Sequence, residues 1–159
     1  MLTQLEAAAV FAPLHTPAAL AVIRFAQATF AEAAQVACFD TTFHAGMPEA
    51  ARTLSIPKAQ RSEGLQRCGF HGLSCESIVR QLAANLPRRL VIAHLGNGVS
   101  ISAVECGRSI DTSMGLTPTG GTLRGTRSGD LAPGLLIHLM RAHRFDAARL
   151  GRSPGTHGR

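Results

Sequence analysis

The stretch from Leu90 to Asp111 constrains the fold most strongly, because it has the pattern of consecutive strands joined by tight turns. A short apolar run from Leu90 to Ala93 ends at His94, and a Leu-Gly-Asn-Gly turn occupies residues 95–98. A glycine turn of this kind can bring backbone N–H groups close to a phosphate. An Asn-Gly hairpin without a ligand is the commoner use of such a turn, so both interpretations stay open.

The second half of this stretch continues the strand pattern. In residues 99–104, the apolar Val99, Ile101 and Ala103 alternate with Ser100, Ser102 and Val104. Cys106-Gly107 then forms a second turn. The pattern predicts a three-stranded meander over residues 89–111, with Asn97-Gly98 at the first turn.

The composition is that of a globular chain with one or two small domains. The 159 residues are 45% hydrophobic and 16% charged, and no apolar run reaches the 18 residues that a membrane span needs. The amino terminus lacks a basic start and a small-residue cleavage pattern, so we expect a cytoplasmic protein. The four cysteines (Cys38, Cys68, Cys75 and Cys106) have no CxxC spacing, so we expect free thiols and no metal site.

The net charge of +6 does not indicate a nucleic-acid partner. Residues 141–159 hold five arginines and one acidic residue, Asp146, and so carry +4 of that charge. The chain has no Trp or Tyr and seven Phe, too few for the interleaving of basic and aromatic residues that stacks bases. We therefore expect no nucleic-acid partner.

Helical periodicity predicts helices over residues 2–12, 18–30, 74–85 and 133–142 and a shorter one near 59–66. A buried-strand pattern from Gln35 to Phe39 ends at Asp40. A carboxylate at the end of such a strand faces the crevice where α/β folds bind ligands. The alternative is that Asp40 caps a turn of helix that begins directly after it.

Three further polar residues have two interpretations each. His15, in a proline-bracketed turn, is either a capping or solvated residue or a ligand contact. His71, between two glycines, begins a helix at a location that favours anions, and is either structural or catalytic. Arg127, in a long Gly/Thr loop, either binds phosphate or carboxylate or pairs with Asp130.

Six motifs occur in order between about Ala12 and Leu139: APLHTP, FDTTFH, GFHGLS, HLGNGVSISAVECG, DTSMGLTP and GTRSGD. Together they resemble the acetate kinase (acetokinase) family. The resemblance implies an α/β fold with two ribonuclease H-like domains, as in the superfamily of acetate and sugar kinases and actin. By this comparison residues 1–88 are the remainder of the first domain, residues 89–150 begin the second, and residues 151–159 are an unrelated basic tail.

The resemblance also implies a reaction, the ATP-dependent phosphorylation of acetate to acetyl phosphate by direct in-line transfer. ATP and Mg²⁺ are the implied cofactors, acetate and ATP are the implied partners, and the family is homodimeric. The matching catalytic positions are His71, Arg127 and Asp40, with His15 at the substrate; the phosphate-binding positions are His94, Leu95, Gly96, Asn97 and Gly98. The alternatives are a propionate or other short-chain carboxylate kinase, or a non-catalytic fragment that binds phosphate weakly at most.

The chain also departs from the family pattern. Cys75 stands where the family has a second histidine. The family's amino-terminal Asn/Ser strand and phosphate loop, its upstream substrate arginine, its adenosine pocket and its magnesium-associated glutamate have no counterpart here. We therefore expect an internal fragment of an acetate kinase that is inactive alone.

Overall fold

The computed structural model describes residues 2–11, 16–125 and 128–151. The chain divides into two compact units, Met1–Phe39 and Asp40–Arg159, which are described separately below. Within the described residues, no helix is both long enough and apolar enough to cross a membrane.

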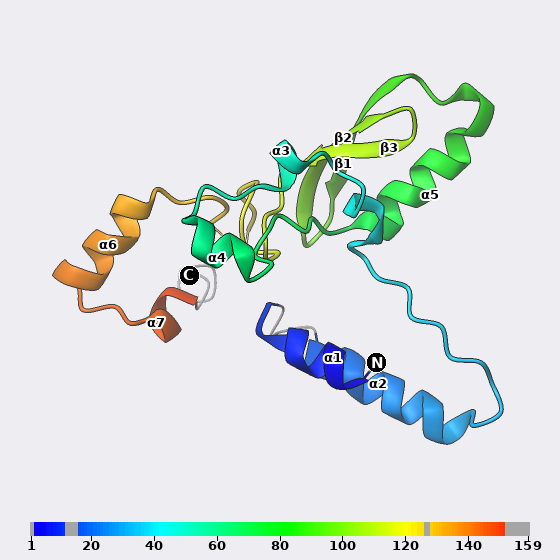
Figure 1. Cartoon of the computed structure of the whole chain (residues 1–159), viewed down its shortest axis with the longest axis horizontal. Coiled ribbons are helices and arrows are strands. Elements are labelled where there is room, and N and C mark those ends of the chain that lie inside the picture. The colour runs from blue at the N-terminus through cyan, green and yellow to red at the C-terminus, as the bar shows by residue number, and fades with distance from the viewer. Residues whose placement is uncertain (1, 12–15, 126–127, 152–159) are drawn as a thin grey trace. The chain divides into compact units, whose positions relative to one another are not determined.

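The first unit is a pair of helices (Figure 1). Its elements are α1 (Leu2–Ala7), the 3₁₀ helix η1 (Ala8–Phe11) and α2 (Thr16–Thr29). The two helices predicted over residues 2–12 and 18–30 are therefore confirmed. Leu20 of α2 is buried, and an ion pair joins Arg24 on α2 to Glu6 on α1.

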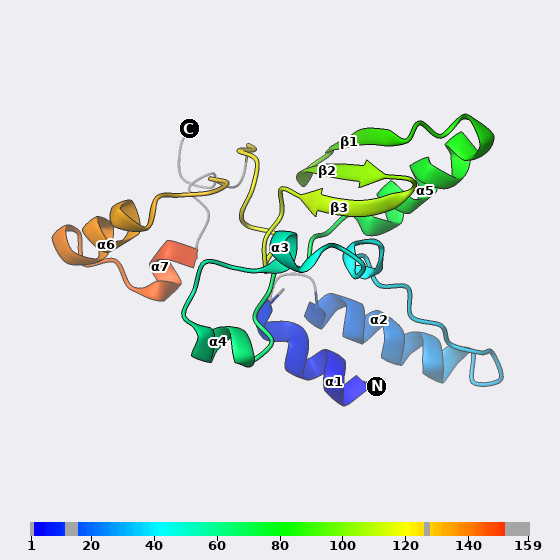
Figure 2. The ribbon, with the colours of Figure 1, turned by 45° about the horizontal axis from the view of Figure 1, so that its top comes forward.

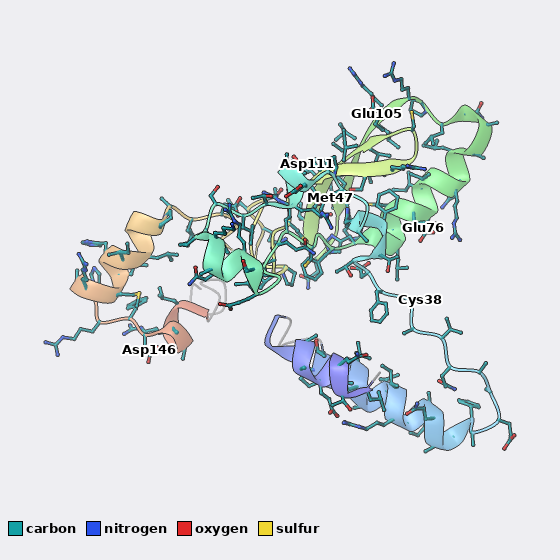
Figure 3. All side chains as sticks on the ribbon, in the orientation of Figure 1. Cys38, Met47, Glu76, Glu105, Asp111 and Asp146 are labelled. Carbon is teal, nitrogen blue, oxygen red and sulfur yellow. The ribbon has the colours of Figure 1, made fainter. Side chains whose placement is uncertain are left out.

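The short strand predicted over Gln35–Phe39 is wrong. Residues 34–39 have no regular secondary structure, and Cys38, labelled in Figure 3, is exposed on this link. Val36 is 82% exposed, and the described sheet contains no strand from this segment. A strand exists only through hydrogen bonds to a neighbouring strand, so the apolar pattern alone was not sufficient.

The second unit combines a three-stranded sheet with short helices. Its elements are η2 (Thr42–His44), α3 (Glu49–Arg52), α4 (Lys58–Ser62), α5 (Gly72–Leu82), η3 (Ala83–Asn85), β1 (Arg89–Leu95), β2 (Val99–Glu105), β3 (Arg108–Thr112), α6 (Pro133–Ala142) and α7 (Ala147–Gly151). The helices predicted near 59–66, over 74–85 and over 133–142 are confirmed within a few residues. The sequence did not predict α3 or α7.

The predicted meander is confirmed. The strands lie in the order β1-β2-β3 and pair antiparallel, with Leu95 opposite Val99 and Arg89 opposite Glu105. Residues 96–98 join β1 to β2, so Asn97-Gly98 lies in the first turn as predicted.

The helix α5 lies beside this sheet in both Figure 1 and Figure 2. The buried core consists of Cys75, Ile92 and Val104, with Phe43, Ile78, Val79 and Leu90 packed against it. The same side of the sheet also buries hydroxyl side chains, those of Ser100, Ser102, Ser109 and Thr112. This covered side, lined by α5 and η2, carries the candidate site.

The family's division into domains at residues 88 and 89 stays a prediction. Residues 152–159, the predicted basic tail, lie outside the described residues.

Candidate functional site

Asp40 fixes the start of α5. Its carboxylate accepts hydrogen bonds from the backbone N–H of His71 (2.6 Å, to Oδ2) and of Leu73 (3.2 Å, to Oδ1). Its carbonyl oxygen accepts a third bond from the N–H of Gly72 (2.7 Å). The first N–H groups of a helix lack partners within the helix, and a negative charge there also interacts favourably with the helix dipole. Asp40 thus caps the distant helix α5, whereas the sequence pattern predicted a cap for the turn of helix that directly follows it, where η2 has no side-chain cap bond. Its catalytic role stays a prediction.

His71 is the residue at the head of α5, as the sequence predicted. Its backbone is left-handed (φ 61°, ψ 26°), a conformation that histidine tolerates better than most residues and that the bonds to Asp40 hold in place. Its ring Nδ1 lies 2.9 Å from the hydroxyl oxygen of Ser100 on β2. Burial, followed by the charge of His94, lowers the pKa of His71 below its ordinary value of 6.5, so the ring is neutral at neutral pH.

His94, near the end of β1, stacks on His71. The ring centroids lie 4.0 Å apart with 19° between the ring planes. The Nδ1 atom of His94 lies 3.1 Å from the hydroxyl oxygen of Ser74 on α5. The structure therefore brings together two of the predicted site histidines, each paired with a serine.

The glycine turn lies directly against these rings. A Cβ atom added to Gly98 would lie 2.7 Å from Nε2 of His71, and one added to Gly96 would lie 3.2 Å from Nε2 of His94. Only glycine permits the first approach without displacing the ring. The N–H of Gly96 donates to the carbonyl oxygen of Gly98 (3.0 Å), so this N–H is used within the turn. Leu95 and Asn97, the other members of the predicted phosphate loop, are exposed.

His44 is a component that the sequence reasoning missed. It is fully buried, its Nδ1 lies 2.8 Å from the hydroxyl oxygen of Ser109 on β3, and its Nε2 lies 3.1 Å from the carbonyl oxygen of Phe70. Burial lowers the pKa of His44, which favours the neutral ring. His44 thereby attaches the residue before His71 to the sheet; its place in the FDTTFH motif was the available signal.

Arg124 was missed as well. Its guanidinium donates to the carbonyl oxygens of Val99 on β2 (2.8 Å) and Gly120 (3.2 Å), which fastens the following loop to the sheet. Its charge contributes to the lowered pKa of His71. The neighbouring Arg127 and the distant His15, both predicted site residues, lie outside the described residues. The carboxylate of Asp130, the alternative partner of Arg127, accepts a bond from the N–H of Gly121 (2.7 Å).

Cys75 does not take the place of the family histidine as a support for the His71 ring. Its side chain is fully buried in the core, where its Sγ lies 3.8 Å from the hydroxyl oxygen of Ser102. The described support of the ring comes from Ser100 and His94 instead.

Two surface grooves lie elsewhere in the second unit. One of about 520 Å³ lies between α3 and α4, and one of about 540 Å³ is lined by Arg67, Ile101, Asp111 and Asp130. Neither is lined by the two histidines or the glycine turn. Among the described residues no group of three or more His, Cys, Asp or Glu side chains could hold a metal ion.

A helix amino terminus, two stacked histidines and a glycine turn lie in contact here, and such a group of donors suits an anion, as in a phosphotransferase. Comparison with known proteins identifies the family. The model of the acetokinase family matches residues 1–152. The chain belongs to the acetokinase family.

The most similar relatives include acetate kinases and a propionate kinase. The chain is 48% identical to the acetate kinase of Shewanella loihica over 142 residues, and 48% identical to that of Streptomyces coelicolor over 147 residues. These matches cover 86% and 89% of this chain and 36% of each relative. The crystal structure of a propionate kinase from Francisella tularensis matches 94% of this chain and 40% of its own, with a TM-score of 0.87 and 39% identity. The α/β acetate kinase fold is thereby confirmed, and the chain spans little more than a third of the curated relatives it matches.

Proposed function

We propose that this chain supplies one wall of an acetate kinase site, which transfers a phosphoryl group from ATP to acetate and forms acetyl phosphate. The observation that carries the proposal is the contact of the neutral His71 ring with the turn at Gly98, at the head of α5. The family membership supports it, because the relatives are carboxylate kinases. With ATP as the donor, we infer a cytoplasmic enzyme, homodimeric like its family.

The reaction requires little covalent chemistry from the protein. The carboxylate of acetate is already ionised at neutral pH, so in-line attack needs no general base; it needs positioning and compensation of charge on the transferring group. A neutral imidazole can donate one hydrogen bond to a phosphoryl oxygen without carrying a charge of its own. We assign this role to His71, with His94 and the glycine turn at the nucleotide phosphates.

Arg127, Asp40 and His15 have the remaining proposed roles. The planar guanidinium of Arg127 suits the developing charge on the phosphoryl group, and His15 contacts the substrate. Asp40 orients His71 through the backbone bonds described above.

ATP and Mg²⁺ are implied by the family. The glycine turn and the two histidines are the residues we assign to the phosphates of a nucleotide, because the turn approaches both Nε2 atoms and a side chain at Gly98 would crowd that of His71. Among the described residues no group of three or more His, Cys, Asp or Glu side chains could hold a metal ion, so we assign no described residue to the magnesium ion.

Propionate is a second candidate acceptor. The similarity to the propionate kinase of Francisella tularensis favours it, and a short-chain carboxylate differing by one methylene changes binding by only about 1–3 kcal/mol. Comparing kcat/KM for acetate and propionate in the chimera below would distinguish the two.

The test uses a chimera in which this chain replaces the matching segment of the Streptomyces coelicolor acetate kinase. With ATP, magnesium, acetate and hydroxylamine, we expect the chimera to form acetyl hydroxamate. His71→Ala and Arg127→Ala should each lower kcat by about 10²–10³-fold, because each removes a donor to the transition state. His138→Ala, on α6, is the matched control and should change it little. A folded chimera without activity, or an active one that tolerates His71→Ala, would contradict the proposal.

The isolated 159 residues provide the complementary measurement. We expect no acetyl phosphate above a no-enzyme control, because a few donors do not replace the nucleotide and metal contacts on which phosphoryl transfer depends. Appreciable turnover by the isolated chain would refute the view that the relatives' remaining segments are required.

A further inference from the structure

The stacked histidines are held by a crossed pair of serine contacts. His71, at the head of α5, has its Nδ1 against Ser100 on β2, whereas His94, on β1, has its Nδ1 against Ser74 on α5. Each ring is thus paired with a hydroxyl from the opposite side of the helix–sheet contact. With Nδ1 occupied in both rings, Nε2 is the nitrogen left to face the glycine turn, as the approaches to Gly98 and Gly96 show.

The protonation of the rings decides what these Nε2 atoms can do. A neutral imidazole carries one N–H and one bare nitrogen, so its two tautomers present opposite groups to a ligand. A bare Nε2 would repel an anion at the turn, whereas an Nε2–H would donate to it. The partner of Nδ1 selects between these tautomers.

The burial of Ser100 indicates which tautomer is present. The side chain is fully buried, and within the described part of the chain its hydroxyl has one partner, Nδ1 of His71. A buried O–H without an acceptor costs about 1–3 kcal/mol, and an unused oxygen lone pair is tolerated more easily. The hydroxyl therefore donates to Nδ1, and the ring proton lies on Nε2.

We propose that Ser100 is a positioning residue that donates its hydroxyl proton to Nδ1 of His71 and so holds the Nε2–H tautomer toward the glycine turn. The use of this N–H group on a phosphoryl oxygen rests on the proposed function. The tautomer itself does not depend on it.

The test is imidazole ¹⁵N NMR of the full chain with labelled histidine, at a pH above 7, where the lowered pKa of His71 keeps its ring neutral. In the wild type we expect the signals of His71 to report protonated Nε2 and bare Nδ1. Ser100→Ala should reduce the Nε2–H population of His71, whereas Ser74→Ala, which removes a serine from the other ring, should leave it in place. Ser102→Ala is the matched control, because Ser102 is equally buried two residues along β2 and bonds to Thr112, not to a histidine.

A wild-type His71 protonated on Nδ1 would overturn the proposal, and so would a Ser100→Ala spectrum identical to that of Ser102→Ala. If Ser100→Ala does not fold, the wild-type spectrum alone decides. Correct tautomers in the chain combined with an inactive chimera would refute the proposed kinase function and leave this inference standing.

Discussion

The two faces of the β1–β3 sheet differ in where they place polar and apolar side chains, because the covered face buries hydroxyl groups beside its apolar core and the other face exposes apolar residues. The face covered by α5 and η2 buries serines, a threonine and His44, while the other face leaves Val91 (68%), Leu95 (78%) and Ile101 (42%) exposed. The buried polar groups are hydrogen-bonded, as burial requires. The covered face thus holds the site histidines in place through its buried serines. The exposed face contributes little to the stability of the described fold.

The sharpest test of this contrast uses two adjacent residues of β1. Ile92 is in the core and Val91 points to the exposed face. We expect Ile92→Ala to lower the free energy of unfolding by about 2–5 kcal/mol, because it removes buried contacts and leaves a cavity. Val91→Ala, the matched control, should change it by less than about 0.5 kcal/mol. Urea unfolding followed by circular dichroism measures both, and equal losses would show that the exposed face is covered in solution.

A smaller effect is expected at the cap of α5. Asp40→Ala leaves the N–H groups of His71 and Leu73 without their acceptor and should cost about 2 kcal/mol in the same unfolding experiment. Asp40→Asn keeps one oxygen acceptor and should cost less. If both variants are as stable as the wild type, the Asp40 cap does not stabilise α5.

The smallest expected effect is a pH dependence that comes from the covered face. The pKa of His44 is lowered in the folded state by burial, so the unfolded chain binds more protons below its ordinary pKa of 6.5. Stability is therefore complete above about pH 6.5 and falls as the pH decreases from there toward the folded pKa, with a slope of at most about 1.4 kcal/mol per pH unit for one group.

His71 adds to this slope in the same direction. His44→Gln should reduce the slope between pH 7 and pH 5, and the double variant with His71→Gln should reduce it further. Measuring the free energy of unfolding at several pH values checks this, and an unchanged slope in His44→Gln would contradict it.

Local features of the sequence predicted most of the fold. The meander followed from alternation and two glycine turns, and α2, α5 and α6 followed from periodicity, because these signals act within a few residues. The strand over residues 35–39 failed because it depended on a distant partner. Neither face of the sheet could be assigned from alternation, since the usual rule would have placed Ser100 and Ser102 outside.

The site was only partly predictable for the same reason. The position of His71 at a helix start is local, and the sequence indicated it. Its partners are not: Ser100 lies 29 positions away, and Ser109 lies 65 positions from His44. The two interpretations of Asp40 differed only in what it contacts, which required the folded chain.

The three hydrogen bonds that Asp40 accepts have a further consequence, for local unfolding at the start of α5. Asp40 and His71 are 31 positions apart, so these hydrogen bonds close residues 41–70 into one loop. The same loop is also attached to β3 by His44 through Ser109 and by Arg67 through Thr112, so breaking the Asp40 bonds frays the start of α5 while the loop stays attached. A ligand that binds only the ordered His71 should therefore slow amide exchange at His71, Gly72 and Leu73, whose N–H groups bond to Asp40, even where it does not contact them.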